Sequence, residues 1–197
     1  MMQRLKSLIL RVLDDHRVMT LATNRPDGWP QATMVGYVND GLLLYSFVAR
    51  NAQKYANILR DPRVSAAIGS DAPNPRDIRG LSLAGHAAEV TDAAEFDDIA
   101  RLRLKRYPEY ADNRAAASDH DGAAARLLSQ PSPENVALLR IAPDIISVLD
   151  YANGFGHSEL VTFSDRDLDV HLRSLRHPWD GLAGTARDAT VDVAADA

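Results

Sequence analysis

The sequence predicts a mainly β domain, a small closed or split barrel of antiparallel strands with flanking helices. Many short hydrophobic runs follow one another closely, separated by turn residues such as Asn39-Asp40-Gly41. One longer stretch, about residues 92–130, lacks strand alternation and indicates a helical insert. We therefore place the domain at residues 1–163. Residues 164–197 are expected to be a polar C-terminal extension that is partly disordered.

Composition narrows the classes of function. The 197 residues are 46% hydrophobic and 25% charged, enough to bury a core. The net charge of −5, without a long basic run, argues against a nucleic-acid partner, and no apolar run is long enough to suggest a membrane partner. The absence of cysteine removes disulfides, thiolate catalysis and Cys-ligated zinc. No metal site is predicted. Nothing suggests export, and the cytoplasm is the expected location.

The first half of the chain predicts one helix and three neighbouring strands. A helix is expected over residues 2–15, where leucine, isoleucine and valine side chains recur at helical spacing and would lie on the core. Strands connected by short turns must pair as antiparallel neighbours. These strands are expected over residues 17–23, 30–38 and 42–47.

A second helix should follow, with Asn51 as its N-cap and Asp61-Pro62 at its end. Its apolar face would contain Ala52, Tyr55, Ile58 and Leu59. After this helix, strands are expected over residues 63–69, 79–90, 135–141, 144–151 and 157–163, and Pro143 breaks the chain between the third and fourth of them. Helices are expected over residues 92–107, with Thr91-Asp92 as the cap, and over residues 121–129.

The segment from Tyr45 to Lys54, YSFVARNAQK, has the chemistry of a phosphate-binding site. A strand ends there and a helix begins, and the first turn of a helix offers unpaired N–H groups to an anion. Ser46, Arg50, Gln53 and Lys54 add a hydroxyl, a guanidinium, an amide and an ammonium group, and Arg50 and Lys54 are spaced to face one point. The same residues are also explained as solvated cations and ordinary helix caps. Residue spacing alone does not favour the phosphate-binding interpretation over this one. No P-loop or G-x-G-x-x-G motif is present.

The run RVMTLATNRPDGWPQATMVGYVNDGLLLYSFVARNAQKYANILRDPRVSAAI contains several motifs in a fixed order. A T-L-A-T strand is followed by a D-G-x-P turn, a D-G-hydrophobic-Y-S strand and the helix and strand from Lys54 to Val64. In this order the motifs resemble the flavin-binding split-barrel proteins of the pyridoxamine 5′-phosphate oxidase-like superfamily. The resemblance covers residues 5–91, and residues 146–161 look like the closing strands of an uncharacterised branch.

The resemblance implies a homodimer with two FMN molecules at the subunit interface. The second strand would run along the ring and ribityl chain, and Gly80 would reach the flavin from the partner subunit. The phosphate would lie near Tyr45 and Ser46 and be held by Gln53 and Lys54, and we add Arg50 and Asn51 from the connecting loop as our own inference. The second-strand residues implied are Gln31, Ala32, Thr33 and Met34.

Two departures bear on the activity. Gln31 and Gly36 stand where the true oxidase has an arginine and a lysine, which argues against pyridoxamine phosphate as the substrate. The leading hypothesis is therefore an FMN-dependent oxidoreductase acting on a nicotinamide or another small organic substrate, with no side chain assigned as catalytic. The alternatives are a non-catalytic flavin or haem binder, for which His157 and His86 are the candidate axial ligands, and a deazaflavin (F420)-dependent reductase.

Two groups of side chains outside this segment have ordinary explanations. His157 is interpreted as a hydrogen-bonded turn histidine in preference to a flavin or substrate contact. The basic residues of the third helix are interpreted as a solvated face in preference to the rim of a site for an anionic substrate. These residues are Arg101, Arg103, Lys105 and Arg106.

Overall fold

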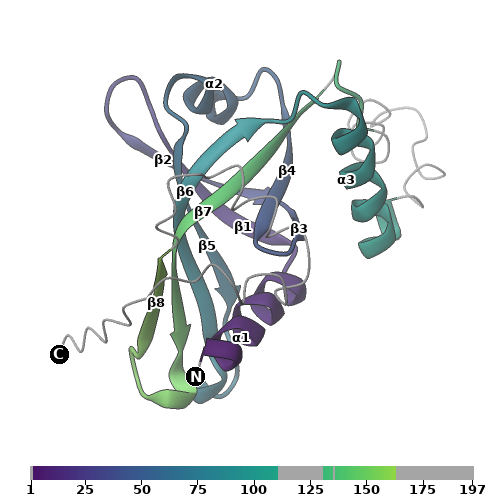
Figure 1. Cartoon of the computed structure of the whole chain (residues 1–197). Helices are drawn as coiled ribbons and strands as arrows, with labels where there is room; N and C mark the ends of the chain where they lie inside the picture. Colours follow the sequence, from purple (N-terminus) through teal and green to yellow (C-terminus); the bar gives the residue numbers. More distant parts are fainter. Residues whose placement is uncertain (1, 111–130, 135, 163–197) are drawn as a thin grey trace.

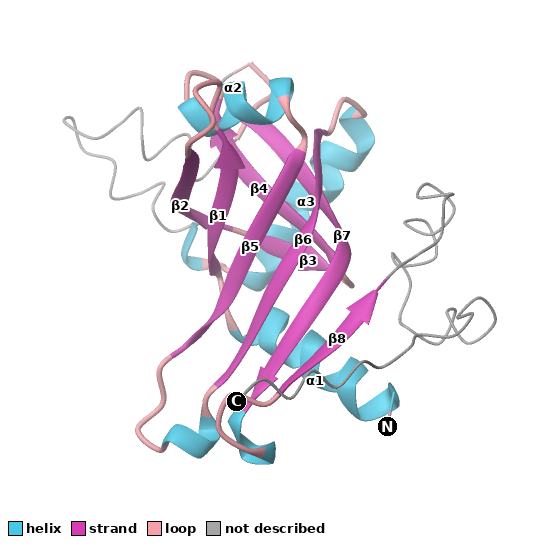
Figure 2. Ribbon diagram, turned by 90° about the vertical axis from the view of Figure 1, so that its left-hand side faces the viewer, coloured by secondary structure: helices cyan, strands magenta, loops and turns pink. Residues whose placement is uncertain are grey.

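The computed structural model describes residues 2–110, 131–134 and 136–162, and their strands form one curved antiparallel sheet with flanking helices (Figures 1 and 2). The order along the sheet is β2-β1-β5-β6-β7-β4-β3, with β8 also paired to β7. The strands are β1 (Val18–Asn24), β2 (Pro30–Gly36), β3 (Val38–Asp40), β4 (Leu43–Ala49), β5 (Arg63–Ser70), β6 (Arg79–Glu89), β7 (Val136–Asp150) and β8 (Ser158–Thr162). The helices are α1 (Met2–Asp15), α2 (Gln53–Arg60) and α3 (Ala93–Arg106), with short 3-10 helices η1 (Pro75–Asp77) and η2 (Tyr151–Asn153).

The two ends of this sheet meet, which makes it a split barrel. Strands β2 and β3 lie at opposite ends of the strand order, yet only Tyr37 separates them in the chain. The Ser46 hydroxyl in β4 donates to the Gly36 carbonyl at the end of β2, at 2.9 Å. The predicted fold class is therefore confirmed, although the single strand expected over residues 30–38 is interrupted at Tyr37.

Helix α1 has the predicted bounds and packs on β5 and β6 with its apolar side. The Tyr37 hydroxyl donates to the Leu13 carbonyl at 2.8 Å and ties the end of the helix to the barrel. The side chains that were expected to lie on the core are at most 6% exposed: Leu5, Leu8, Ile9, Val12 and Leu13. The predicted helix over residues 121–129 and the extension at residues 164–197 lie outside the described residues.

Strand β7 is continuous, so the predicted break at Pro143 is wrong. The β6–β7 register shifts between Ala84 and Gly85, and Gly85 faces Pro143 while Asp144 is the extra residue of a β-bulge. Proline lacks the N–H that the ladder requires, and a bulge is one of the few ways a sheet accommodates it. The strand therefore bends at Pro143 and continues. Its first part pairs with β4 and its last part with β8.

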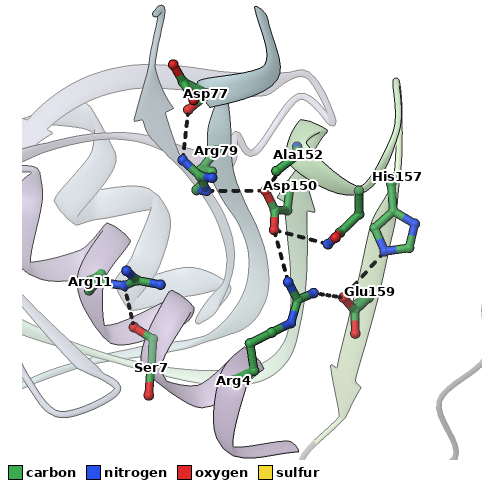
Figure 3. Close-up of polar contacts among 10 residues, drawn as sticks. Arg4, Ser7, Arg11, Asp77, Arg79, Asp150, Ala152, His157 and Glu159 are labelled. Carbon is green, nitrogen blue, oxygen red and sulfur yellow. Dashed lines mark hydrogen bonds and ion pairs between the residues drawn. The ribbon is translucent and has the colours of Figure 1, made fainter. Parts of the chain in front are cut away.

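A buried carboxylate at the end of β7 organises the far end of the barrel (Figure 3). Asp150 is 3% exposed and accepts hydrogen bonds from the Ala152 backbone N–H at 3.2 Å and the Asn153 amide at 3.1 Å. It also forms ion pairs with Arg79 at 3.2 Å and with Arg4 of α1 at 3.7 Å. One side chain thus joins α1, β6 and the η2 turn.

His157 belongs to the same end of the molecule, where its ring nitrogen lies 3.4 Å from the nearly buried Glu159 carboxylate (Figure 3). Glu159 also accepts a hydrogen bond from Arg4 at 3.2 Å. This geometry matches the turn-histidine interpretation.

Asp150→Ala is expected to lower the free energy of unfolding by about 2–3 kcal/mol, because it leaves two arginines and a turn without their acceptor. Chemical denaturation of the two proteins measures the difference. Asp98→Ala is the matched control, since Asp98 is 69% exposed and pairs only with the neighbouring surface residue Arg101 among the interactions described. An Asp150→Ala loss as small as that of the control would show that the carboxylate does not hold this end together.

Candidate functional site

Helix α2 lies over the end of β1 and the start of β2 (Figures 1 and 2). Amide side chains form a hydrogen-bonded cluster between them. Asn57 is fully buried and donates to the Thr23 hydroxyl at 3.0 Å and to the Gln31 amide oxygen at 3.1 Å. Its own oxygen accepts from the Gln53 amide at 2.9 Å. The structure thus brings together Gln31 and Gln53, two predicted site residues, through Asn57. We call Gln31, Gln53 and Asn57 the amide cluster.

Asn57 was not among the predicted site residues. The predicted apolar face of this helix contained Leu59, but Leu59 is 62% exposed and Asn57 is buried instead. A buried amide with every hydrogen bond satisfied takes a position that hydrophobic spacing assigns to an apolar residue. The available signal was the asparagine of the family-like motif from Lys54 to Val64.

The N-terminus of α2 lies beside the amide cluster. The helix begins at Gln53 with Ala52 as its N-cap and no capping side chain, so the predicted N-cap role of Asn51 is wrong. The first-turn N–H groups at Gln53 and Lys54 are therefore not satisfied by a side-chain cap. Lys54 is half-buried and takes part in no ion pair with another described residue. An ammonium group at the positive end of a helix is electrostatically favourable only beside an anion.

Arg50 points to a different set of groups. Its guanidinium lies 2.6 Å from a Glu89 carboxylate oxygen and donates to the Pro133 carbonyl at 2.8 Å and the Tyr55 hydroxyl at 3.0 Å. The Tyr55 hydroxyl donates to the second Glu89 oxygen at 2.6 Å. Arg50 thus joins the loop before α2 to the end of β6, while Lys54 has no counter-ion among the described residues.

The hydrogen bond from Tyr55, reinforced by Arg50, holds the pKa of Glu89 below its ordinary value. A carboxyl with a lowered folded-state pKa contributes stability at pH values above its unfolded pKa, about 4.3, and loses it as the pH falls through the folded value. The Glu89→Gln protein should therefore be less stable than the unmodified protein at pH 7, and the difference should shrink below about pH 4.3. Thermal unfolding at pH 7 and at several pH values below about 4.3 measures this difference. A difference independent of pH would contradict the assignment, and Glu134→Gln, an exposed glutamate nearby, is the control.

Strand β2 presents two different faces beside the cluster. Gln31 and Thr33 share one face because they are two residues apart, and Ala32 and Met34 share the other, exposed face. Met34 is 77% exposed. The Thr33 hydroxyl is buried and has no hydrogen-bond partner among the described residues. A buried orphan hydroxyl beside the amide cluster fits a bound group with polar atoms along β2.

The other predicted residues are placed further from the start of α2. The Tyr45 hydroxyl donates to Glu95 of α3 at 3.0 Å, and Ser46 is fully buried with its hydroxyl directed at Gly36. Gly80 is the second of 11 residues in β6, whereas Glu89 is the last and lies near α2, so about 30 Å of strand separates them. Gly80 therefore does not lie at this corner within its own chain.

A pocket of about 260 Å³ opens between α3 and the strands β2, β3 and β4. Arg103 is 8% exposed, and its guanidinium carbon lies 4.2 Å from the centre of the Tyr110 ring and 5.1 Å from that of Phe47. Burial lowers the pKa of Arg103. The solvated-face interpretation is thus wrong for Arg103, which lines the pocket together with Gly36, Tyr37, Tyr45, Phe47, Tyr107 and Tyr110.

A second pocket, of about 340 Å³, lies over β1, β5 and β6. His86 lines it, and its Nδ1 lies 2.7 Å from Asp144 on the β-bulge, which leaves the other ring nitrogen outside this pair. Across residues 2–110, 131–134 and 136–162, no three or more His, Cys, Asp and Glu side chains are arranged to hold a metal ion. None of the helices described is long and apolar enough to cross a membrane.

These features define an antiparallel split barrel in which a short helix begins beside a polar cluster at the start of the second strand. Residues 5–147 match the family model of pyridoxamine 5′-phosphate oxidase, and the chain belongs to that family. Its similarity to a general stress protein places it in the branch that resembles the oxidase without being the oxidase itself.

Individual relatives agree with this assignment. General stress protein 26 of Bacillus subtilis is 31% identical over 106 residues, which cover 53% of this chain and 74% of that protein. The structure of general stress protein 26 from Bacillus anthracis is similar with a TM-score of 0.52 and 22% identity, covering 74% of this chain and 93% of the other. The haem storage protein HutZ from Vibrio cholerae is similar with a TM-score of 0.51 and 19% identity, covering 68% and 87%. The two structures show a shared fold.

Proposed function

We propose that this chain binds FMN at the corner between β2 and α2, and that it is an FMN-dependent oxidoreductase with the flavin at the interface of a homodimer. The observation that most strongly supports this proposal is the start of α2, where uncapped N–H groups and the Lys54 ammonium lie beside the amide cluster. A phosphate dianion is the ligand best matched to a helix N-terminus with an added cation. The family membership supports a flavin as the molecule that carries this phosphate.

The rest of the site fits the remainder of FMN. Strand β2, with the orphan Thr33 hydroxyl on one face and the exposed residues Ala32 and Met34 on the other, would run along the ribityl chain and ring. Gly80, far from this corner in its own chain, would contribute from the partner subunit, which is why the proposal includes a dimer. Arg50 would act indirectly, by fixing the loop that leads into α2.

When bound, the flavin supplies the redox chemistry, and the protein supplies binding and orientation. The pocket at Gly36 and α3 would admit a nicotinamide or other small organic substrate, and its aromatic walls would exclude water. The buried Arg103 would favour a substrate with a negative group. Gln31 and Gly36 stand where the true oxidase has an arginine and a lysine, so pyridoxamine phosphate is not the proposed substrate.

Haem binding is the second candidate, and a specific contact favours it. His86 is held by Asp144, and a carboxylate behind a histidine orients the ring and makes the other nitrogen a better metal ligand. The fold is shared with a haem storage protein. This site would be non-catalytic and would lie in the pocket over β1, β5 and β6, away from Lys54.

The absorption spectrum of the purified protein, with thermal unfolding after addition of FMN, F420 or haem, separates these functions. Flavin absorption, or stabilisation by FMN, supports the leading proposal. A Soret band that disappears in His86→Ala supports haem, and stabilisation by F420 but not FMN supports the deazaflavin enzyme. A colourless protein that FMN does not stabilise would refute FMN binding.

A further inference from the structure

Asn57 is a fully buried polar residue of α2 whose side-chain bonds are all made inside the protein. Its NH₂ group donates to both Thr23 and Gln31, and its oxygen accepts from Gln53. Burying an amide is unfavourable unless its hydrogen bonds are replaced, and here each one is. The bonds to Thr23 and Gln31 join α2 to β1 and β2, and the bond from Gln53 lies within α2.

Two of these bonds each fix one edge of a glutamine. The Gln31 oxygen is occupied by Asn57, so its NH₂ group is the edge left to face a ligand. Gln53 uses one N–H on Asn57 and retains its oxygen and second N–H. A glutamine side chain has many rotamers, and ordering it at the moment of binding lowers affinity. Asn57 removes that cost before a ligand arrives.

We propose that Asn57 is the positioning residue of the cofactor site, which holds Gln31 and Gln53 in the orientation that receives the phosphate-bearing end of the flavin. This inference rests on the proposed function. Asn57 itself does not touch the ligand, because its polar atoms are consumed by Thr23, Gln31 and Gln53. Its effect on binding must therefore pass through the two glutamines.

A double-mutant cycle tests this dependence. Asn57→Leu removes the amide at similar volume and is combined with the double variant Gln31→Ala/Gln53→Ala. Alone, Asn57→Leu should weaken FMN binding, measured by quenching of flavin fluorescence, by about tenfold or more. In the double-variant background it should add less than about twofold, because the residues through which it acts are gone. If Asn57→Leu weakened FMN binding by the same factor in the unmodified protein and in the double variant, the proposal would be overturned. Leu59→Ala, on the exposed side of α2, is the control and should leave the affinity unchanged.

A measurement without cofactor separates this inference from the proposed function. The side-chain amide signals of Gln31 and Gln53 in a proton–nitrogen NMR spectrum should be dispersed in the unmodified protein and move to free-glutamine positions in Asn57→Leu. Signals that stay dispersed in Asn57→Leu would overturn the positioning role even if FMN binds. If the unmodified protein does not bind FMN, the proposed function fails and the amide signals alone decide whether Asn57 orients the two glutamines. Asn57→Ser provides the same test if the leucine variant does not fold.

Discussion

Replacing Gly85 by alanine is expected to lower the free energy of unfolding by about 3 kcal/mol or more, a fall of roughly 6–12 °C in Tm for a domain of this size. A β-carbon at Gly85 would lie 2.1 Å from the Ala142 carbonyl oxygen and 2.8 Å from the Pro143 α-carbon. Both are backbone atoms of the paired strand, so the clash cannot be relieved by a side-chain rotation. Relief requires β6 and β7 to separate at the bulge.

Thermal and denaturant unfolding of Gly85→Ala measures this loss. Gly36→Ala is the matched control, because a β-carbon at Gly36 would meet only the Arg17 carbonyl oxygen at an ordinary 3.8 Å. The control should change stability by no more than about 0.5 kcal/mol. If the two variants lost the same small amount, the close approach of β6 and β7 at the bulge would be wrong.

Lys54→Ala is expected to weaken FMN binding by about 10- to 100-fold and to change riboflavin binding by less than about twofold. The difference arises because only FMN has the phosphate, and a charge-assisted bond to a dianion belongs to the strong class of hydrogen bond. Titrations monitored by quenching of flavin fluorescence give both dissociation constants.

Lys105→Ala, which removes an exposed lysine from α3, is the control and should alter neither constant. Equal losses for FMN and riboflavin in Lys54→Ala would show that Lys54 does not contact the phosphate. The control also separates a local effect from a general change in net charge.

The elements with local signals were predictable from the sequence. The leucine spacing of residues 2–15 predicted α1 with its buried side, and Asp92 caps α3 as expected, accepting from the Ala94 N–H at 2.8 Å. Helical periodicity and capping are properties of consecutive residues. Pro143 misled the prediction because its consequence depends on Gly85, far away in sequence, which lets the strands approach and the bulge form.

The candidate site was predictable only where its residues are neighbours in the sequence or belong to a family-like motif. The sequence grouped Gln53 and Lys54 at one helix start, and the resemblance added Gln31 from β2. Neither the sequence pattern nor the resemblance predicted that Arg50 would pair with Glu89, 39 residues away. They also did not predict that Asn57 would be the buried link between Gln31 and Gln53. Polar partners that meet only in the folded chain leave no periodic pattern in the sequence.

A crystal structure of the protein prepared with FMN tests the central claim most directly. We predict the phosphate within hydrogen-bonding distance of the Lys54 ammonium and the N–H groups at the start of α2, with the flavin extending along β2. A phosphate bound elsewhere, or a flavin in the pocket beside His86, would contradict the account.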